Sequence, residues 1–242
     1  MCNSVKGIIN SVQSLGTLDG PGIRYVLFLQ GCNLRCGCCH NPDTWDISGG
    51  YEADAQEILS KAMRYKSYFS EDGGITVSGG EPLLQAEFVR ELFRLCHEEG
   101  INTCLDTSGS ILNDKVIELL AETDRVLLDI KYTSEEQYKK YVGCSMDTPL
   151  RFLDKLEELS VPTVLRQVII PSLNDNDENI EKLAKLINNY RCVEKAELLA
   201  FKKICKVKYD NLGINFPFES FETPSKELML SLEDKLNSLI KR

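Results

Sequence analysis

Short apolar runs alternate with amphipathic stretches along most of this chain of 242 residues. The runs are rich in Val, Ile and Leu, which is typical of strands buried on both faces of a sheet. The predicted strands are 25–29, 75–77, 102–105, 125–128, 164–170 and 196–199. Strands separated by helices predict a parallel sheet that is built from right-handed crossovers.

The amphipathic stretches between these strands have the period of helices. The predicted helices are 53–66, 87–99, 114–121, 149–159, 177–189 and 225–240. Gly100 is a suitable residue to end the second helix, and Ser225 is a plausible N-cap for the last.

About six strand–helix units are visible, and residues 201–224 contain no clear further unit. A full eight-unit barrel usually needs ~250 residues. We therefore expect an α/β fold with an incomplete parallel (β/α)6 barrel, rather than a full barrel or an open doubly wound sheet. Without a linker or repeat, residues 1–242 are predicted to form a single domain. Its core spans about 20–200, and a C-terminal segment, 201–242, closes the barrel.

The composition excludes several classes of protein. Lys and Arg number 28 against 37 Asp and Glu, which gives a net charge of −9. An acidic chain is a poor candidate for binding nucleic acid through its phosphates. No apolar run approaches the ~20 residues of a membrane span, and the N-terminal residues lack a signal-peptide pattern. We expect a protein of the cytoplasm that binds neither nucleic acid nor membrane.

The chain has ten cysteines. In the reducing cytosol they are not expected to form a disulfide framework. Six are scattered, and because free Cys is usually buried we predict that they are small core residues. These six are Cys2, Cys96, Cys104, Cys144, Cys192 and Cys205.

The other four cysteines lie within eight residues, directly after the first predicted strand. Cys32, Cys36 and Cys39 form the pattern C-x3-C-x2-C, and Cys38 stands beside the last of them. Three thiolates can hold three irons of a cubane cluster and leave one iron open to a small molecule, whereas iron–sulfur clusters are normally held by four Cys. Zinc remains the main alternative, although structural zinc sites usually take their four ligands as two spaced pairs.

Polar residues follow three more of the predicted strands, as "SGGEP" (Ser78–Pro82), "DTSG" (106–109) and "DIK" (129–131), and Arg166 lies inside the fifth strand. In parallel α/β folds, sites form at the carboxyl ends of the strands. Taken alone, each motif is better explained as a turn, a helix cap or a surface charge than as part of a functional site. The segment "DGPGIR" before the first strand is likewise better explained as a turn. Four such ends in succession favour one polar site.

Taken together, these segments resemble a known family. "CNLRCGCC" is similar to the cysteine signature of radical S-adenosylmethionine enzymes, and "SGGEP" to their glycine-rich segment. More narrowly, "TLDGPGIRYVLFLQGCNLRCGCCHNPDTW" resembles the activating enzymes of glycyl radical enzymes, most closely the pyruvate formate-lyase branch. The resemblance covers roughly residues 7–200 and continues through "INTCLDTSG", "VLLDIK" and "VEKAELL". No insert with further four-Cys sets is present, which also favours this branch.

The resemblance implies roles for individual residues. Cys32, Cys36 and Cys39 match the ligands of one [4Fe-4S] cluster. The positions matching the S-adenosylmethionine site are Cys38, Cys39, His40, Gly80, Glu81, Asp106, Asp129, Ile130 and Lys131. At Cys38 the backbone, not the thiol, is expected to contact the adenine. Lys131 and Asp19 are the predicted catalytic residues, with Asp19 near the entering substrate peptide.

In similar enzymes the two acids Asp106 and Asp129 also help to hold a monovalent cation. One departure concerns the sixth strand, which the branch commonly follows with Pro-Tyr-His. This chain has Ala200, Phe201 and Lys202 there. Lys202 could still pair with a carboxylate as a point charge, but it cannot act as an imidazole.

The activity implied by the resemblance is that of an oxidoreductase in an anaerobic setting. Reduced flavodoxin or ferredoxin supplies an electron, S-adenosylmethionine is cleaved to a 5′-deoxyadenosyl radical, and this radical takes a hydrogen atom from a glycine of the partner enzyme. The partner would be a glycyl radical enzyme such as pyruvate formate-lyase, and the protein a monomer. The alternatives are a radical enzyme acting on a small molecule, of the deazaguanine synthase kind, and a zinc-binding or structural protein.

Overall fold

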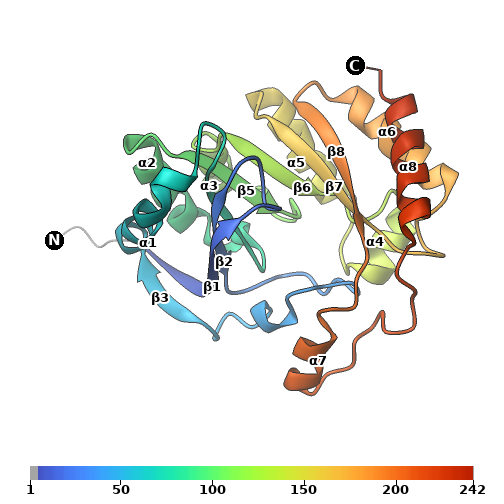
Figure 1. Cartoon of the computed structure of the whole chain (residues 1–242), viewed down its shortest axis with the longest axis horizontal. Helices are drawn as coiled ribbons and strands as arrows, with labels where there is room; N and C mark the ends of the chain where they lie inside the picture. The colour runs from blue at the N-terminus through green and yellow to red at the C-terminus, as the bar shows by residue number, and fades with distance from the viewer. Residues whose placement is uncertain (1–4, 242) are drawn as a thin grey trace.

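The computed structural model describes residues 5–241, which form an eight-stranded sheet with helices packed around it (Figure 1). The strands are β1 (Lys6–Gly16), β2 (Arg24–Leu29), β3 (Tyr51–Asp54), β4 (Gly74–Gly79), β5 (Asn102–Thr107), β6 (Arg125–Asp129), β7 (Thr163–Ile169) and β8 (Val193–Ala200). Their order across the sheet is β3-β1-β2-β4-β5-β6-β7-β8. From β2 to β8 every neighbouring pair is parallel. The α/β class and the mostly parallel sheet are confirmed.

Two strands extend the sheet beyond the prediction. β1 pairs antiparallel with both β2 and β3, so the β3 edge of the sheet is antiparallel. β1 was missed because much of it is exposed and polar, and β3 because it has only four residues. The prediction of a helix from residue 53 was wrong, since Ala53 and Asp54 belong to β3. The Asp54 carboxylate instead caps the following helix by accepting a hydrogen bond from Glu57 N at 2.8 Å.

The helices are α1 (Ala55–Ala62), α2 (Ala86–Glu98), α3 (Asp114–Leu120), α4 (Glu135–Tyr141), α5 (Asp147–Leu159), α6 (Asp177–Asn189), α7 (Lys206–Leu212) and α8 (Lys226–Leu239). Short 3-10 turns are η1 (Pro42–Thr44), η2 (Met63–Tyr68) and η3 (Pro82–Gln85). The predicted caps are confirmed, because Ser225 Oγ accepts from Leu228 N and Gly100 has a positive φ of 64°. Only α4 and α7, of seven residues each, were not predicted.

Residues 5–241 contain two large apolar cores and a small third cluster of Cys104, Leu127 and Val164. The larger lies between the sheet and the helices that cover it. The second lies beneath the cysteine segment and takes many of its side chains from the C-terminal part of the chain, including Phe201, Tyr209, Phe216 and Phe218. In Figure 1 the chain leaves β8, descends to α7 and returns to α8, which packs beside α6. The C-terminal segment therefore packs against the cysteine segment.

The scattered cysteines fit their predicted role. Cys96, Cys104, Cys192 and Cys205 are buried, whereas Cys144 is half-buried at the edge of the second core. Cys2 lies outside the described residues. All nine cysteines between residues 5 and 241 are free thiols.

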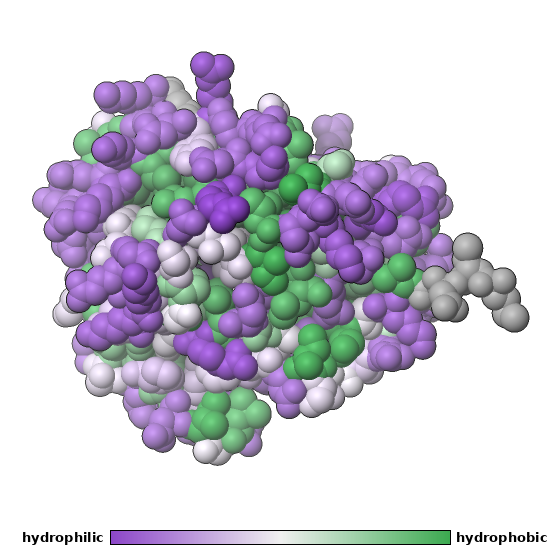
Figure 2. All heavy atoms as spheres, turned by 180° about the vertical axis from the view of Figure 1, so that it is seen from behind, coloured by the Kyte–Doolittle hydropathy of each residue, from purple (hydrophilic) through white to green (hydrophobic). Residues whose placement is uncertain are grey.

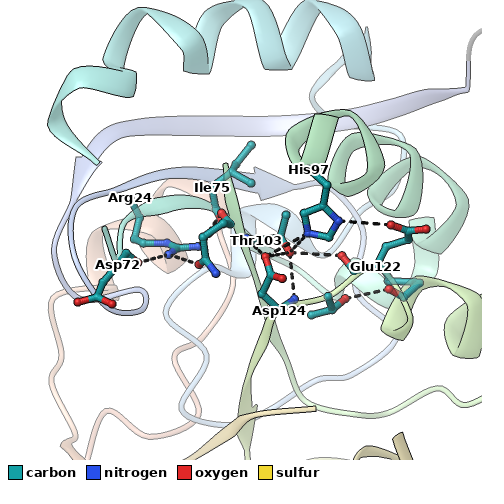
Figure 3. Close-up of polar contacts among 10 residues, drawn as sticks. Arg24, Asp72, Ile75, His97, Thr103, Glu122 and Asp124 are labelled. Carbon is teal, nitrogen blue, oxygen red and sulfur yellow. Dashed lines mark hydrogen bonds and ion pairs between the residues drawn. The ribbon is translucent and has the colours of Figure 1, made fainter. Parts of the chain in front are cut away.

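The amino end of the parallel sheet is closed by polar contacts (Figure 3). The buried Arg24 guanidinium donates to Thr76 Oγ1 at 2.9 Å, to Asn102 Oδ1 at 2.8 Å and to the Asp72 carbonyl oxygen at 3.0 Å. Nearby, His97 Nε2 lies 3.1 Å from Asp124 Oδ2. These contacts join β2, β4 and β5 at the end away from the cysteines.

None of the helices within residues 5–241 has the length and apolar character needed to span a bilayer. The face shown in Figure 2 is largely hydrophilic, with apolar groups between the charged areas. One such group covers α7 at the lower left of that view, where Val207 and Leu212 are exposed.

Candidate active site

A cavity of about 210 Å³ lies at the carboxyl ends of the parallel strands. It brings together most of the predicted site residues, namely Cys32, Cys36, Cys38, Cys39, His40, Gly80, Asp106, Asp129 and Lys131. They come from the segment after β2, the turn after β4 and the ends of β5 and β6. Segments up to a hundred residues apart thus meet because parallel strands end at the same edge.

The cysteine segment is fixed by the backbone around it. Leu34 N donates to Cys32 Sγ and Asn41 N to Cys39 Sγ, both at 3.4 Å. Burial raises the pKa of Cys32 and of Cys38 to about 11 and that of Cys36 well above its usual range. Thiolates in this place therefore need a cationic partner.

The thiols fit an iron–sulfur cluster better than a single ion. Within residues 5–241 no three Cys, His, Asp or Glu side chains are arranged to hold one metal ion. A cubane does not need that arrangement, because each thiolate binds a different iron. Free thiols facing one cavity and N–H groups directed at two of the sulfurs match such a cluster. Cys38 lines the same cavity, so its position alone does not separate it from the other three.

Opposite the thiols, the cavity wall carries acids and bases in close pairs. Lys131 Nζ donates to Asp129 Oδ2, and Arg166 Nη1 lies 3.4 Å from Asp106 Oδ1. The strand register places Asp129 beside Arg166. Ser78 Oγ donates to Asp106 Oδ2 at 2.7 Å.

These pairs shift the ionisation of the wall. Burial raises the pKa of Asp106 to about 6, while Arg166 acts in the opposite direction. Burial disfavours the charge of Lys131, but Asp129 and the neighbouring sulfurs raise its pKa above the usual range. A wall with both carboxylates and cations can bind a zwitterionic ligand, such as one with an ammonium and a carboxylate group.

Three predicted site residues do not line this cavity. Glu81 is buried, and its carboxylate accepts hydrogen bonds from Leu83 N, Thr107 Oγ1, and both the N–H and hydroxyl of Ser108. It therefore joins the turn after β4 to the end of β5. Ile130 is fully buried in the main core.

Asp19, the third, lies in the β1–β2 turn, where its carbonyl oxygen accepts from Thr76 Oγ1 at 2.6 Å. Burial raises the pKa of its carboxyl, and Arg166 partly offsets this. The residues on either side of Asp19 line a larger groove of about 940 Å³ that runs along β8. The groove also reaches His40 and Lys202, so it adjoins the cavity.

Gly80 is explained by close packing of two turns. A Cβ built on it would lie 2.1 Å from the Gly31 carbonyl oxygen. Glu81 N donates to that same oxygen at 2.8 Å. The turn after β4 can therefore press against the start of the cysteine segment only with glycine at this position.

Lys202 contacts the site through its backbone. Its carbonyl oxygen lies 3.0 Å from His40 Nε2, while its side chain is exposed. Burial lowers the pKa of His40. Lys202 is thus in the groove rather than in the cavity.

Among the other residues that line the cavity are Trp45, Ser78 and Arg166. From the sequence, Ser78 and Arg166 were noted near strand ends but given no role, and Trp45 was not identified. A charge inside the apolar run of β7 was a usable signal for Arg166, and Ser78 lies in the glycine-rich motif already identified. Trp45 carries no local signal, because its approach to the cysteines depends on how the chain folds back after η1.

Comparison with known proteins agrees with this geometry. Residues 26–187 match the model of the Radical SAM superfamily. The chain is 45% identical to a pyruvate formate-lyase-activating enzyme of Clostridium pasteurianum, over 98% of this chain and 99% of the relative. It is 42% identical to pyruvate formate-lyase 1-activating enzyme of Escherichia coli K12, over 93% of each.

Solved structures with lower identity show the same fold. A domain of a pyruvate-formate lyase-activating enzyme from Bacteroides vulgatus matches with a TM-score of 0.57 and 22% identity, covering 69% of this chain and 94% of that one. Streptococcus suis SuiB bound to S-adenosylmethionine matches with a TM-score of 0.66 and 14% identity, covering 86% and 45%.

The family match and the curated relatives do not favour a zinc protein or a radical enzyme of the deazaguanine synthase kind. The motif pattern, the cavity and the identity over nearly the whole chain agree with one another. This chain therefore belongs to the radical SAM superfamily and, within it, to the family of pyruvate formate-lyase activating enzymes.

Proposed function

We propose that this protein activates a glycyl radical enzyme of the pyruvate formate-lyase kind, by cleaving S-adenosylmethionine reductively and abstracting hydrogen from a glycine of that partner. The observation that carries the proposal is the single cavity in which the free cysteines face the acid and base pairs of β5, β6 and β7. The identity to activating enzymes over nearly the whole chain supports the same reading.

In this proposal Cys32, Cys36 and Cys39 hold a [4Fe-4S] cluster, and Cys38 contributes its backbone to the ligand site. When bound, the cluster supplies the electron and the open iron for cleavage of the sulfonium ligand. The N–H donors on Cys32 and Cys39 keep their sulfurs oriented.

The remaining residues bind and orient S-adenosylmethionine. Asp129 and Lys131, paired in the cavity wall, contact its polar groups, and Lys131 also supplies a positive charge to the wall, balanced by Asp129. His40 and the backbone at Gly80 and Ile130 complete the site. Glu81 supports it by fixing the Gly80 turn to the end of β5. Asp106, together with Asp129, is the proposed place of a monovalent cation.

The partner peptide would approach through the groove beside Asp19, since that groove opens onto the cavity at His40 and Arg166. The proposal also includes the architecture, the oligomeric state, the compartment and the electron donor. They are a (β/α)6 partial barrel in one domain, a monomer in the cytoplasm, and reduced flavodoxin or ferredoxin as the electron donor. The parallel strands β2 and β4–β8 support the barrel count.

The direct test is anaerobic reconstitution with iron and sulfide, followed by incubation with reductant, S-adenosylmethionine and pyruvate formate-lyase. A glycyl radical signal in electron spin resonance, together with release of 5′-deoxyadenosine, is the expected result. The Cys36→Ser variant should give neither product. Cleavage without any radical on the partner would contradict activation, and a protein that takes up zinc but no iron would contradict the cofactor assignment.

A further inference from the structure

Trp45 has a buried hydrogen-bond donor that the fold does not use. The residue follows η1, and its ring lines the cavity that holds the cysteines. Its indole Nε1 is buried and makes no regular hydrogen bond to any residue between 5 and 241. A buried donor that has lost its water and found no other acceptor destabilises the folded state. The indole N–H therefore needs a hydrogen-bond acceptor within the cavity. This acceptor can be a bound group or a neighbouring atom that becomes negatively charged when a group binds.

Two neighbouring side chains pack against the Trp45 ring. Tyr209 packs edge-on against the ring, with centroids 5.9 Å apart and an interplanar angle of 84°. The Arg35 guanidinium lies over the ring, 5.0 Å from the centroid. Trp45 and Cys39 line the same cavity, and Tyr209, which packs against the indole, also contacts the backbone of Cys39.

Cys39 is held firmly at the same point. Asn41 N donates to its sulfur at 3.4 Å, and Tyr209 Oη donates to its carbonyl oxygen at 3.1 Å. The indole would thus be a second donor to one sulfur of the proposed cluster. A neutral thiol is a weak acceptor, whereas a metal-bound thiolate is an anionic one and accepts a stronger hydrogen bond.

Building on the proposed function, we propose that the Trp45 indole N–H donates to the Cys39 thiolate in the cluster-loaded protein and raises the reduction potential of the cluster. Reduction adds one negative charge, and a donor to the sulfur stabilises that charge. Hydrogen bonds to cluster sulfurs are among the factors that set such potentials. The Arg35 cation on the ring face polarises the indole and strengthens its N–H as a donor.

Tyr132 offers a comparison. Its hydroxyl is also buried without a partner among residues 5–241, and its ring packs in the second core beside Cys36 and Cys38. It does not line the cavity, however. Arg166 also lines the cavity and has a buried Nε without a hydrogen bond, but this Nε lies 3.8 Å from Glu197 Oε2 in an ion pair. Among the donors of residues 5–241 that border the cavity without a hydrogen bond, the indole N–H of Trp45 is thus the uncharged one.

The test compares Trp45→Phe with wild type after anaerobic reconstitution. Phenylalanine keeps an aromatic ring between Arg35 and Tyr209 but removes the N–H. A redox titration followed by electron spin resonance should give a more negative midpoint potential in the variant, at unchanged iron content. The matched control is Tyr209→Phe, which loses the hydrogen bond to the Cys39 carbonyl oxygen but no donor to the sulfur. Its potential should stay at the wild-type value.

Trp45 is the only tryptophan of the chain, so a second measurement needs no variant. Ultraviolet resonance Raman spectra of wild type should show a stronger indole N–H hydrogen bond in the loaded than in the cluster-free protein. An unchanged potential in Trp45→Phe, or equal shifts in both variants, overturns the tryptophan inference while leaving the activase proposal intact. A wild-type protein that binds no cluster overturns both.

Discussion

At the scale of single residues, the cysteine segment poses a choice among four thiols in one cavity. Spacing and the family resemblance assign Cys32, Cys36 and Cys39 as ligands, whereas the structure places Cys38 in the same cavity. Substitution of single cysteines distinguishes the ligands from the fourth thiol.

We expect Cys38→Ser to retain iron at close to the wild-type level, because its thiol is not needed as a ligand. Cys36→Ser should lose most of the iron, since a three-thiolate site has none to spare. Iron and sulfide per chain after anaerobic reconstitution measure both. Loss of iron from Cys38→Ser would overturn the ligand assignment.

At the same scale, Asp106 should make the stability of the folded protein depend on pH. Its pKa is raised from 3.8 to about 6 in the folded protein, mainly by burial. Between about pH 4 and pH 6 the folded state thus binds more protons than the unfolded state. The contribution of Asp106 to stability therefore falls as pH rises through this window.

The Asp106→Asn variant of the cluster-free protein should consequently be more stable than wild type at neutral pH, by up to about 3 kcal/mol. Near pH 4 the difference should vanish. Urea unfolding at several pH values under reducing, anaerobic conditions measures the effect. The exposed Glu71→Gln serves as control, and a gain that persisted at low pH would argue against this explanation.

At the scale of elements, the segment 201–221 with α7 matters more than its sequence suggested. Phe218 is buried against Tyr141, with ring centroids 5.4 Å apart. Its ring also covers Gly37, where a Cβ would lie only 2.2 Å away. The C-terminal segment thus packs directly onto the backbone between two of the cysteines.

Phe218→Ala should destabilise the cluster-free protein by about 3–5 kcal/mol, as expected for emptying a packed aromatic site. It should also reduce the iron retained after reconstitution, because the cysteine segment loses its support. Val207→Ala, on the exposed side of α7, is the control and should change stability by less than about 0.5 kcal/mol. Guanidinium unfolding measures both, and similar losses in the two variants would refute a specific role of Phe218.

At the scale of the whole molecule, the site exists only once β2 and β4–β7 have assembled, because each contributes a strand end or the segment after it. Ligand binding is therefore coupled to global stability. S-adenosylmethionine at 100 times its Kd should stabilise the cluster-loaded protein by about 2.7 kcal/mol.

In a chain of this size, that gain corresponds to a rise in Tm of several degrees. Anaerobic calorimetry with and without S-adenosylmethionine measures it. The Cys36→Ser variant lacks one of the three proposed cluster ligands and should show a much smaller shift. An equal shift in the two proteins would indicate that the ligand binds without the cluster.

Most of the parallel sheet could be predicted from sequence, since apolar period and helix caps are local properties of the chain. The six predicted strands correspond to β2 and β4–β8 with ends shifted by at most a few residues. β1 and β3 could not be predicted, because their polar residues do not form the apolar pattern of a buried strand. β1 becomes a strand by pairing with β2, and β3 by pairing with β1.

The sequence by itself determined the fold class, the cysteine spacing and the polar motifs at the strand ends, because each depends on residues that are neighbours in the chain. Only the tertiary structure decided which of those side chains share the cavity. It turned Glu81 toward Thr107 and Ser108, added Arg166 and Trp45, and brought Tyr209 to Cys39 and Lys202 to His40. The last two contacts join residues more than 160 positions apart, and no local pattern encodes such distances.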